Sequence, residues 1–210
     1  MMLTLKKQLR LKLQNELPGK VAHIEVAPYR KVDFTEVDIL NAKKSGVLIL
    51  FYLKNNEIYL ALTQRCQYDG KHSGQISFPG GKVEETDKDI YHTALRETNE
   101  EIGVIMQDIE VIGQLTNVFI PVSNFLVFPI VGFINYLPQF NIDNNEVEEL
   151  IELKLTDLIN TRELVQNEVK LANNTKLKVP SFVFNGKIIW GATALILNEL
   201  RHLLFELELN

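Results

Sequence analysis

Short apolar runs alternate with polar turns through the middle of this chain, and longer amphipathic stretches lie toward its ends. Short runs rich in apolar and β-branched residues that stop at Asn, Gly or Pro are typical of strands. Strands are therefore predicted over residues 47–53, 58–64, 75–78, 109–117, 126–135, 176–183 and 187–190. The turn signals Lys54-Asn55-Asn56-Glu57 and Asn185-Gly186 predict hairpins between neighbouring strands.

Apolar residues recur at three- and four-residue intervals in several other stretches, which predicts helices. The predicted helices cover residues 3–17, 34–43, 88–102 and 192–209, with another that begins over residues 155–160 and continues toward residue 165. Thr86 or Asp87 is the expected N-cap of the third helix. Apart from the short helix, residues 18–45 have the pattern of an irregular connector, and residues 146–153 are an acidic stretch. We find no internal repeat or linker, so the pattern predicts a single α+β domain.

Composition narrows the class of protein. The 210 residues are 46% hydrophobic and 23% charged, which is typical of a globular domain with a sizeable core. The formal net charge of -5 argues against polymeric nucleic acid as a partner. A single cysteine, Cys66, rules out an intramolecular disulfide. No apolar run approaches the ~20 residues that span a bilayer, and no signal peptide is apparent, so we expect a cytoplasmic protein without a membrane partner.

The helix over residues 88–102 carries a group of carboxylates. At about 100° per residue, Glu97, Glu100 and Glu101 fall in one sector of its surface. Like charges this close destabilise a bare helix, so the cluster favours a bound cation. Carboxylate oxygens without a Cys and His grouping favour Mg²⁺ or Mn²⁺ over zinc. The alternative is a solvated acidic helix face, but the Gly80-Gly81 turn before the helix and Gly103 after it make that interpretation weaker.

The segment GGKVEETDKDIYHTALRETNEEIGV, residues 80–104, resembles the signature box of the Nudix hydrolases. The residues that fit the family pattern are Gly81, Arg96, Glu97, Glu100, Glu101, Gly103 and Val104. Three positions depart from it. Asp87 replaces a Glu, eight residues instead of seven separate Asp87 from Arg96, and Thr98 stands at an apolar position. The first two departures change the side-chain length and the spacing on which the family's link between this acidic residue and the arginine depends.

The resemblance extends beyond the box. The segment LTQRCQYDGKHSGQISFPGGK, residues 62–82, is similar to the one that precedes the box in the coenzyme A pyrophosphatase branch of the family, where a shifted box also occurs. Residues 121–125 and 189–194 resemble later landmarks of that branch. The resemblance implies a Nudix-type α/β/α sandwich around a mixed sheet. We expect one domain over residues 1–210, with an N-terminal helical extension over about residues 1–45.

The resemblance also implies roles for the carboxylates. Glu97 and Glu101 would be the principal ligands of Mg²⁺ or Mn²⁺, and the Gly81 carbonyl a further one. Glu100 would assist as a ligand or as the base that orients water. A distal carboxylate often completes catalysis in this fold, and we favour Glu146 over its neighbours Glu148 and Glu149.

Other residues are candidates on their own chemistry. Arg96 is expected to bond a neighbouring carboxylate and hold the helix in place. Arg65, Lys71 and His72 are candidates for binding substrate phosphates, against a solvated or structural role for each. Phe78 and Trp190 could stack on adenine, although core packing is the favoured role for both.

The expected activity is hydrolysis of a pyrophosphate bond by an activated water, because metal ions neutralise the anionic oxygens and stabilise the leaving phosphate. The branch resemblance implies coenzyme A or acyl-CoA as substrate, cut to 3′,5′-ADP and (acyl-)4′-phosphopantetheine. The alternatives are another nucleoside diphosphate derivative such as ADP-ribose, or a non-catalytic binding module of the same fold. We expect a small nucleotide as the partner and a monomer or homodimer.

Overall fold

The computed structural model describes residues 1–28, 36–67, 72–161, 163–170 and 175–207. Its helices, apart from one turn of 3-10 helix at Met106–Asp108, are α1 (Met2–Lys12), α2 (Gly19–Val26), α3 (Glu36–Leu40), α4 (Ile90–Ile102), α5 (Leu155–Asn160) and α6 (Gly191–Phe205). The strands of the larger sheet are β1 (Lys43–Lys54), β2 (Glu57–Arg65), β3 (Ile76–Ser77), β4 (Gly80–Lys82), β5 (Glu110–Gln114), β6 (Val118–Ile120), β7 (Phe125–Phe133) and β8 (Val147–Lys154). A smaller sheet contains β9 (Val165–Lys170), β10 (Lys176–Phe184) and β11 (Lys187–Ile189).

The larger sheet is built around β1. Its main order is β3-β2-β1-β7-β5, with β4 paired to β1, β6 to β7 and β8 to β2. The β1–β7 pair is parallel and the other pairs are antiparallel. The predicted mixed sheet is therefore confirmed.

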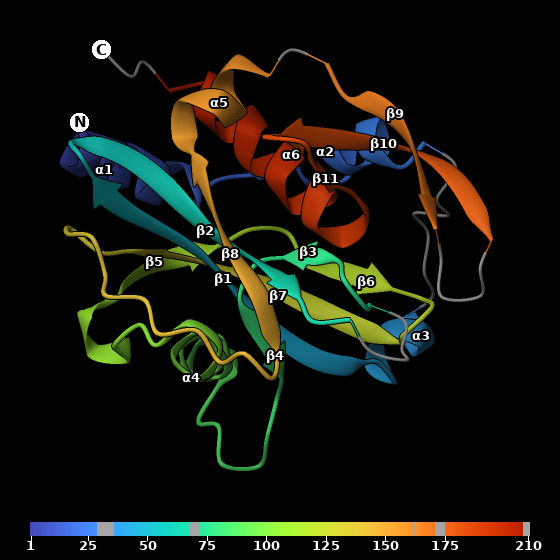
Figure 1. The fold of residues 1–210 in the computed structure, drawn as a ribbon, viewed down its shortest axis with the longest axis horizontal. Coiled ribbons are helices and arrows are strands. Elements are labelled where there is room, and N and C mark those ends of the chain that lie inside the picture. The colour runs from blue at the N-terminus through green and yellow to red at the C-terminus, as the bar shows by residue number, and fades with distance from the viewer. Residues whose placement is uncertain (29–35, 68–71, 162, 171–174, 208–210) are drawn as a thin grey trace.

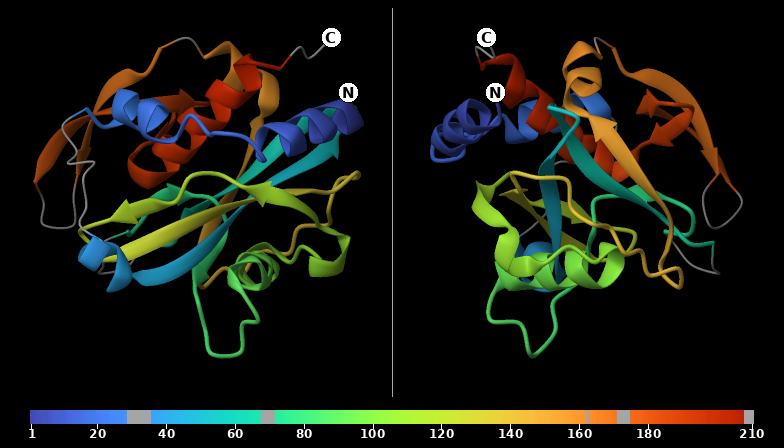
Figure 2. Two further views of the ribbon diagram at one scale, coloured as in Figure 1. Left: turned by 180° about the vertical axis from the view of Figure 1, so that it is seen from behind. Right: turned by 60° about the vertical axis from the view of Figure 1, so that its left-hand side comes forward.

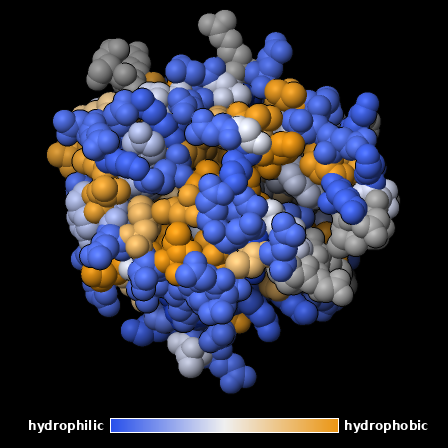
Figure 3. Space-filling view, viewed as in Figure 1, coloured by the Kyte–Doolittle hydropathy of each residue, from blue (hydrophilic) through white to orange (hydrophobic). Residues whose placement is uncertain are grey.

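The sheet lies between two layers of helix, because side chains alternate along β1. Leu48, Leu50 and Tyr52 pack in one core cluster with α4, while Ile49 and Phe51 pack in the other with α1 and α6. Figures 1 and 2 show α4 below the sheet and α1, α2 and α6 above it. In the space-filling view of Figure 3, apolar residues gather in the middle of the face, between these helical layers, and hydrophilic residues surround them. The α/β/α sandwich expected from the sequence is confirmed.

The two hairpin predictions are also confirmed. β1 and β2 are joined through Asn55 and Asn56, and β10 and β11 through Asn185 and Gly186, all with positive φ. Asparagine and glycine tolerate this conformation, which suits a tight turn between twisted strands. None of the described helices is both long and apolar enough to cross a membrane.

Several boundaries and elements differ from the predictions. The helix expected to continue toward residue 165 ends at Asn160, where β9 soon follows, and α1 ends at Lys12 instead of near residue 17. α2 lies within the stretch predicted to be an irregular connector, and β6 was not predicted as a separate strand. The acidic residues 146–153 prove to be mostly strand: β8 pairs with β2 and directs Val147 and Leu153 into the core. Its glutamates mask the strand pattern, since charged side chains are common on edge strands.

A buried carboxylate joins α2 to the C-terminal helix. Glu199 on α6 is fully buried and accepts hydrogen bonds from the Thr116 hydroxyl at 2.6 Å and from the backbone N–H groups of Thr116 and Gly19. His23 on α2 lies 3.0 Å from its other oxygen. Burial opposes ionisation, but the hydrogen bonds from His23 and Thr116 leave the pKa of Glu199 below its usual value. The carboxylate therefore connects α2, α6 and the loop between β5 and β6.

We predict that Glu199→Ala destabilises the fold by about 3 kcal/mol, because it leaves several buried donors without their acceptor. Thermal or urea unfolding measures the change. The matched control is Glu206→Ala, which removes an exposed ion pair with Lys12 and should cost no more than ~1 kcal/mol. Equal losses in the two variants would contradict the connecting role of Glu199.

Candidate active site

Glycines allow α4 to lie close against the sheet. A Cβ on Gly46 of β1 would stand 2.7 Å from the Ile90 carbonyl oxygen at the start of α4. A Cβ on Gly80 would stand 2.3 Å from the Gly46 carbonyl oxygen, and Gly80 has a φ of 149°. Neither position accepts a larger residue without moving backbone atoms. The sequence indicated a turn at Gly80-Gly81, but both glycines belong to strand β4, which pairs with β1. This strand is thereby held directly beside Glu97 and Glu101 of α4.

Asp87 and Arg96 form a paired anchor at the base of the site. Arg96 donates from Nε and Nη2 to the two oxygens of Asp87 at 2.9 and 3.0 Å, so the contact is bidentate. The Thr93 hydroxyl and the Glu84 backbone N–H also donate to this carboxylate, and the His92 ring lies 2.9 Å from it. The Arg96 hydrogen bonds, chiefly, lower the pKa of Asp87 well below its usual value. The link between acid and arginine thus forms despite the altered spacing.

The cap of α4 was assigned to the wrong residue. Asp89, not Thr86 or Asp87, is the N-cap, and its side chain accepts from the His92 backbone N–H at 2.8 Å. The signal was present in the sequence, because Asp89 directly precedes the first apolar residue of the helix. The contribution of His92 and Thr93 to the Asp87 anchor was also missed, since these side chains meet Asp87 only once the loop before the helix folds back.

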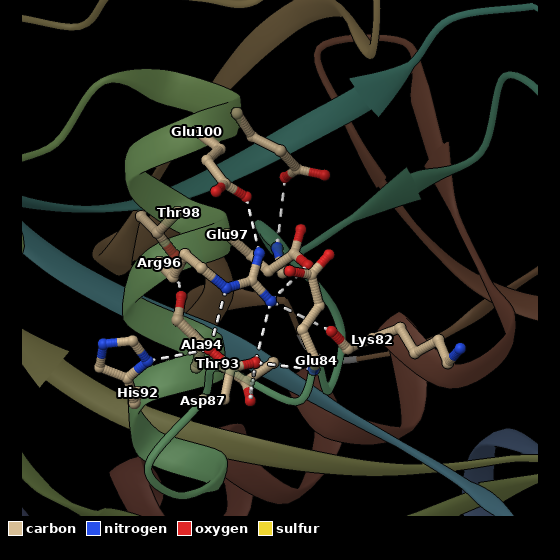
Figure 4. A network of polar contacts seen from close by, with 12 residues as sticks. Lys82, Glu84, Asp87, His92, Thr93, Ala94, Arg96, Glu97, Thr98 and Glu100 are labelled. Atoms are coloured by element: carbon tan, nitrogen blue, oxygen red, sulfur yellow. Dashed lines mark hydrogen bonds and ion pairs between the residues drawn. The ribbon is translucent and has the colours of Figure 1, made fainter.

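Arg96 extends the anchor to the glutamates. It donates from Nη1 to Glu100 at 2.7 Å, and its Nη2 lies 3.0 Å from Glu97 and 3.2 Å from the Lys82 carbonyl oxygen. Figure 4 shows the guanidinium between these groups, with Arg96, Glu97 and Glu100 all projecting from α4. One side chain therefore joins the loop, β4 and the carboxylate face of the helix. Its own pKa is raised by this acidic surrounding, chiefly by the hydrogen bonds to Asp87.

Glu97 and Glu101 are the most buried members of the carboxylate group. Glu101 is 2% exposed, and burial raises its pKa to about 8 even though Arg65 and the Gly80 N–H act against the shift. Burial also raises the pKa of Glu97, against the effect of Arg96. The like charges of Glu97 and Glu146 raise the pKa of Glu101 further. The two carboxylates are thus held together where their charges are poorly compensated.

Glu146 is held near this pair by the loop that precedes β8. The backbone N–H groups of Asn141 and Asp143 donate to the Ile102 and Glu101 carbonyls at the end of α4, at 2.9 and 3.0 Å. The Glu146 carbonyl accepts from the Cys66 N–H at 2.9 Å. Its exposed carboxylate is close enough to raise the pKa of both Glu97 and Glu101.

The two neighbours of Glu146 have other partners. Glu148 accepts a hydrogen bond from the Gln64 amide, and Glu149 forms an ion pair with Lys187. Glu146, by contrast, is among the charges that raise the pKa of Glu97 and Glu101. The geometry therefore favours Glu146 as the distal carboxylate.

The remaining candidates differ in their surroundings. Arg65 Nη1 lies 3.5 Å from Glu101 Oε1, and His72 Nδ1 lies 3.0 Å from the Gln75 side-chain oxygen. Lys71 lies outside the described residues. Phe78 is 2% exposed within the core, whereas Trp190 is half-buried at the N-terminus of α6. Arg65 is the candidate that the fold brings into direct contact with the carboxylate group.

Thr98 and Gly103 complete the helix. Thr98 is fully buried at the position where the family pattern has an apolar residue, and its hydroxyl donates to the Ala94 carbonyl at 2.7 Å. This internal hydrogen bond removes the cost of burying a polar group. Gly103 is the C-cap with a φ of 73°, the left-handed conformation that glycine favours.

The donor chemistry fits a hard divalent cation. Carboxylates whose charges repel one another and are only partly compensated are the ligands that Mg²⁺ and Mn²⁺ prefer. A Cβ on Gly81 would stand 2.3 Å from the carboxylate carbon of Glu97, so the glycine keeps its own backbone and this carboxylate in contact. Within the described ranges, no three His, Cys, Asp or Glu side chains already converge as a preformed metal cage.

Comparison with known proteins identifies the class. The family model described as NUDIX domain matches residues 42–173, which is more than half of the chain. The fold and the carboxylate helix therefore belong to a phosphoric anhydride hydrolase. The chain is a member of the Nudix hydrolase family, and it acts on a nucleoside diphosphate derivative.

Individual relatives support the same family. Proteins named as the uncharacterized Nudix hydrolase NudL are similar over most of the chain. The one from Pectobacterium atrosepticum is 33% identical over 67% of this chain and 72% of its own. The one from Salmonella paratyphi B is 34% identical over 78% of this chain and 83% of its own. A MutT/nudix family protein from Enterococcus faecalis has a similar fold, with a TM-score of 0.54 and 15% identity over 98% of this chain and 76% of that one.

The two adjacent glycines give a matched pair of variants. We predict that Gly81→Ala retains the fold, because its Cβ meets the flexible end of Glu97, but lowers turnover by roughly 100-fold by displacing that carboxylate. Gly80→Ala should instead destabilise the protein, because its Cβ meets backbone atoms and its φ is strained. Circular dichroism with thermal unfolding and steady-state kinetics separate the effects. Full activity in Gly81→Ala would contradict the placement of Glu97.

A second prediction concerns the Asp87 anchor. Asp87→Asn should cost about 3 kcal/mol near neutral pH, because it removes the buried charge that accepts two hydrogen bonds from Arg96. The pKa of Asp87 is lowered on folding, so its contribution is present above the unfolded value of about 3.9 and is lost as the pH falls below it. The stability difference between the two proteins should therefore shrink below about pH 4.

Chemical denaturation at several pH values tests this. The control is Asp157→Asn, at an exposed carboxylate of α5. A difference between wild type and Asp87→Asn that does not change with pH would be inconsistent with an ionised anchor.

Proposed function

We propose that this protein is a metal-dependent pyrophosphohydrolase of coenzyme A or acyl-CoA, which yields 3′,5′-ADP and (acyl-)4′-phosphopantetheine. The observation that carries the catalytic part is the grouping of Glu97, Glu101 and Glu146 beside Gly80 and Gly81 of β4. These carboxylates come from α4 and from the loop that is hydrogen-bonded to its C-terminal end. A complete carboxylate set also argues against a non-catalytic binding module.

Each residue has a distinct role in the proposal. Glu97 and Glu101 would hold Mg²⁺ or Mn²⁺, with the Gly81 carbonyl as a further ligand. The bound ion would neutralise the pyrophosphate oxygens and stabilise the leaving phosphate. Glu146 or Glu100 would orient and deprotonate the attacking water, and Arg96 would fix the direction of Glu97 and Glu100. Of the two candidate bases we favour Glu146, because the Glu100 carboxylate already accepts a hydrogen bond from Arg96.

The substrate assignment is supported by residues 62–82, which resemble the segment before the box in coenzyme A pyrophosphatases. The described part of this segment forms the end of β2, then β3 and β4, and it carries Arg65 beside Glu101 and His72 in the loop between β2 and β3. We propose that Arg65, His72 and Lys71 bind the substrate phosphates. We also propose that residues 1–210 act as one domain, with the helices within residues 1–45 as an extension.

The substrate is tested by incubating the protein with coenzyme A, ADP-ribose and a dinucleotide polyphosphate, with and without Mg²⁺. Chromatography of the products should show 3′,5′-ADP from coenzyme A at the highest kcat/KM, and only with the metal. Faster hydrolysis of ADP-ribose would overturn the coenzyme A assignment but not the assignment of the protein as a hydrolase. Turnover of none of the three, with bound nucleotide detected, would favour a binding module.

Glu101→Gln tests the metal assignment. It should lower kcat roughly 1,000-fold, the equivalent of about 4 kcal/mol of transition-state stabilisation, and leave the fold intact. Glu206→Gln, far from the site on the C-terminal segment, is the matched control. A Glu101→Gln variant with wild-type activity would remove Glu101 from the metal site.

A further inference from the structure

Arg65 occupies an irregular point of the sheet. It is the last residue of β2, and the register between β2 and β8 shifts between Gln64 and Arg65. Such a shift redirects side chains, and irregularities of this kind are frequent next to active sites. Here the Arg65 guanidinium lies beside Glu101, with Nη1 3.5 Å from Oε1.

The ionised form of Glu101 needs a positive partner in this position. Its side chain is 3% exposed, and it accepts a hydrogen bond from the Gly80 N–H at 3.2 Å through the other oxygen. An ionised carboxylate loses most of its hydration when buried, so an uncompensated charge there is costly. Arg65 is the cation that the structure places against Glu101, and it therefore supplies compensation in the protein without metal.

The contact is nevertheless loose. A separation of 3.5 Å is longer than a strong charge-assisted hydrogen bond, which is about 2.7–2.9 Å. The Arg65 Nε is buried without a hydrogen-bond acceptor among the described residues. The side chain as a whole is 29% exposed, so part of the guanidinium already faces solvent. Arg96 is fixed to Asp87 by several hydrogen bonds, whereas Arg65 has a single long contact with Glu101.

We propose that Arg65 is a place-holding cation, which neutralises Glu101 before the metal binds and is displaced from it when the metal arrives. Mg²⁺ binds carboxylate oxygen at about 2.0–2.1 Å, and a guanidinium held against the same carboxylate would repel it. The displaced guanidinium is then free to turn toward an anionic phosphate at the opening of the site. This inference rests on the proposed function, since it requires Glu101 to be a metal ligand.

The consequence is a coupling between metal and substrate. Metal binding releases Arg65, and a phosphate that captures Arg65 weakens its competition for Glu101. By linkage, each ligand should favour the other to the same extent. Arg65 would therefore act as a positioning residue that makes phosphate binding depend on the prior arrival of the metal.

The test compares Arg65→Gln with wild type by thermal unfolding in chelator and at saturating Mg²⁺, and by calorimetric titration with Mg²⁺ alone. Without metal, Arg65→Gln should unfold at a lower temperature than wild type. This difference in unfolding temperature should disappear at saturating Mg²⁺. The variant should also bind Mg²⁺ roughly tenfold more tightly, because no competing cation has to be displaced. If Arg65 had only a structural role, the difference in unfolding temperature would persist at saturating Mg²⁺.

Two variants serve as controls. Lys82→Gln removes an exposed positive charge on β4 next to Gly81, and should change Mg²⁺ affinity by less than about threefold if general electrostatics is a minor contribution. Arg65→Lys keeps the charge and should bind Mg²⁺ nearly as wild type does, which keeps the inference testable if Arg65→Gln does not fold.

The outcomes separate the two proposals. If Arg65→Gln binds Mg²⁺ no more tightly than wild type, or if the difference in unfolding temperature persists at saturating Mg²⁺, the place-holding role is overturned. In that case, loss of Mg²⁺ binding by Glu101→Gln in the same titration would still support Glu101 as a metal ligand. If Glu101→Gln binds Mg²⁺ as wild type does, both the metal assignment and the place-holding role fail.

Discussion

The arrangement of this site depends on bringing carboxylates together where water is largely excluded. Glu97 and Glu101 lie one turn apart on α4, and Glu146 approaches them from the loop before β8. Burial is the main cause of the raised pKa values of Glu97 and Glu101, and the neighbouring negative charges add to the shift. Two arginines limit this cost, and they do so differently. Arg96 is fixed by several short hydrogen bonds, whereas Arg65 makes one long contact.

The positions of these charges follow from backbone packing. Gly46 and Gly80 let α4, β1 and β4 approach more closely than any side chain would allow. The last carbonyls of α4, which have no partner within the helix, accept N–H groups from the loop that carries Glu146. The end of one helix thus sets the position of a carboxylate more than forty positions further along the chain. Cys66, the residue after β2, fixes the same loop by donating its backbone N–H to the Glu146 carbonyl. The site is therefore assembled by main-chain contacts before any ligand is present.

The sequence predicted the elements whose signals are local. The apolar runs of β1 and β2, the Asn185-Gly186 hairpin and the amphipathic pattern of α6 were all recognisable. The sequence did not predict β8, because its glutamates conceal a strand that is defined by pairing with β2. It also did not predict how Arg65 contacts Glu101, since that contact arises from a register shift between two strands distant in the chain. The carboxylate helix was found from spacing alone, but its burial, and hence its electrostatics, required the packing of the whole sheet.

The altered spacing around Asp87 is resolved by the shape of the loop before α4. Asp87 has one methylene fewer than glutamate, and one extra residue lies between it and Arg96. The loop folds back on itself, because the Asp87 N–H donates to the Glu84 carbonyl and the Glu84 N–H donates to the Asp87 side chain. Asp89 then starts the helix two residues later. The longer connection brings the shorter side chain within bidentate reach of Arg96, so loop length and side-chain length change together and the anchor beneath Glu97 is preserved.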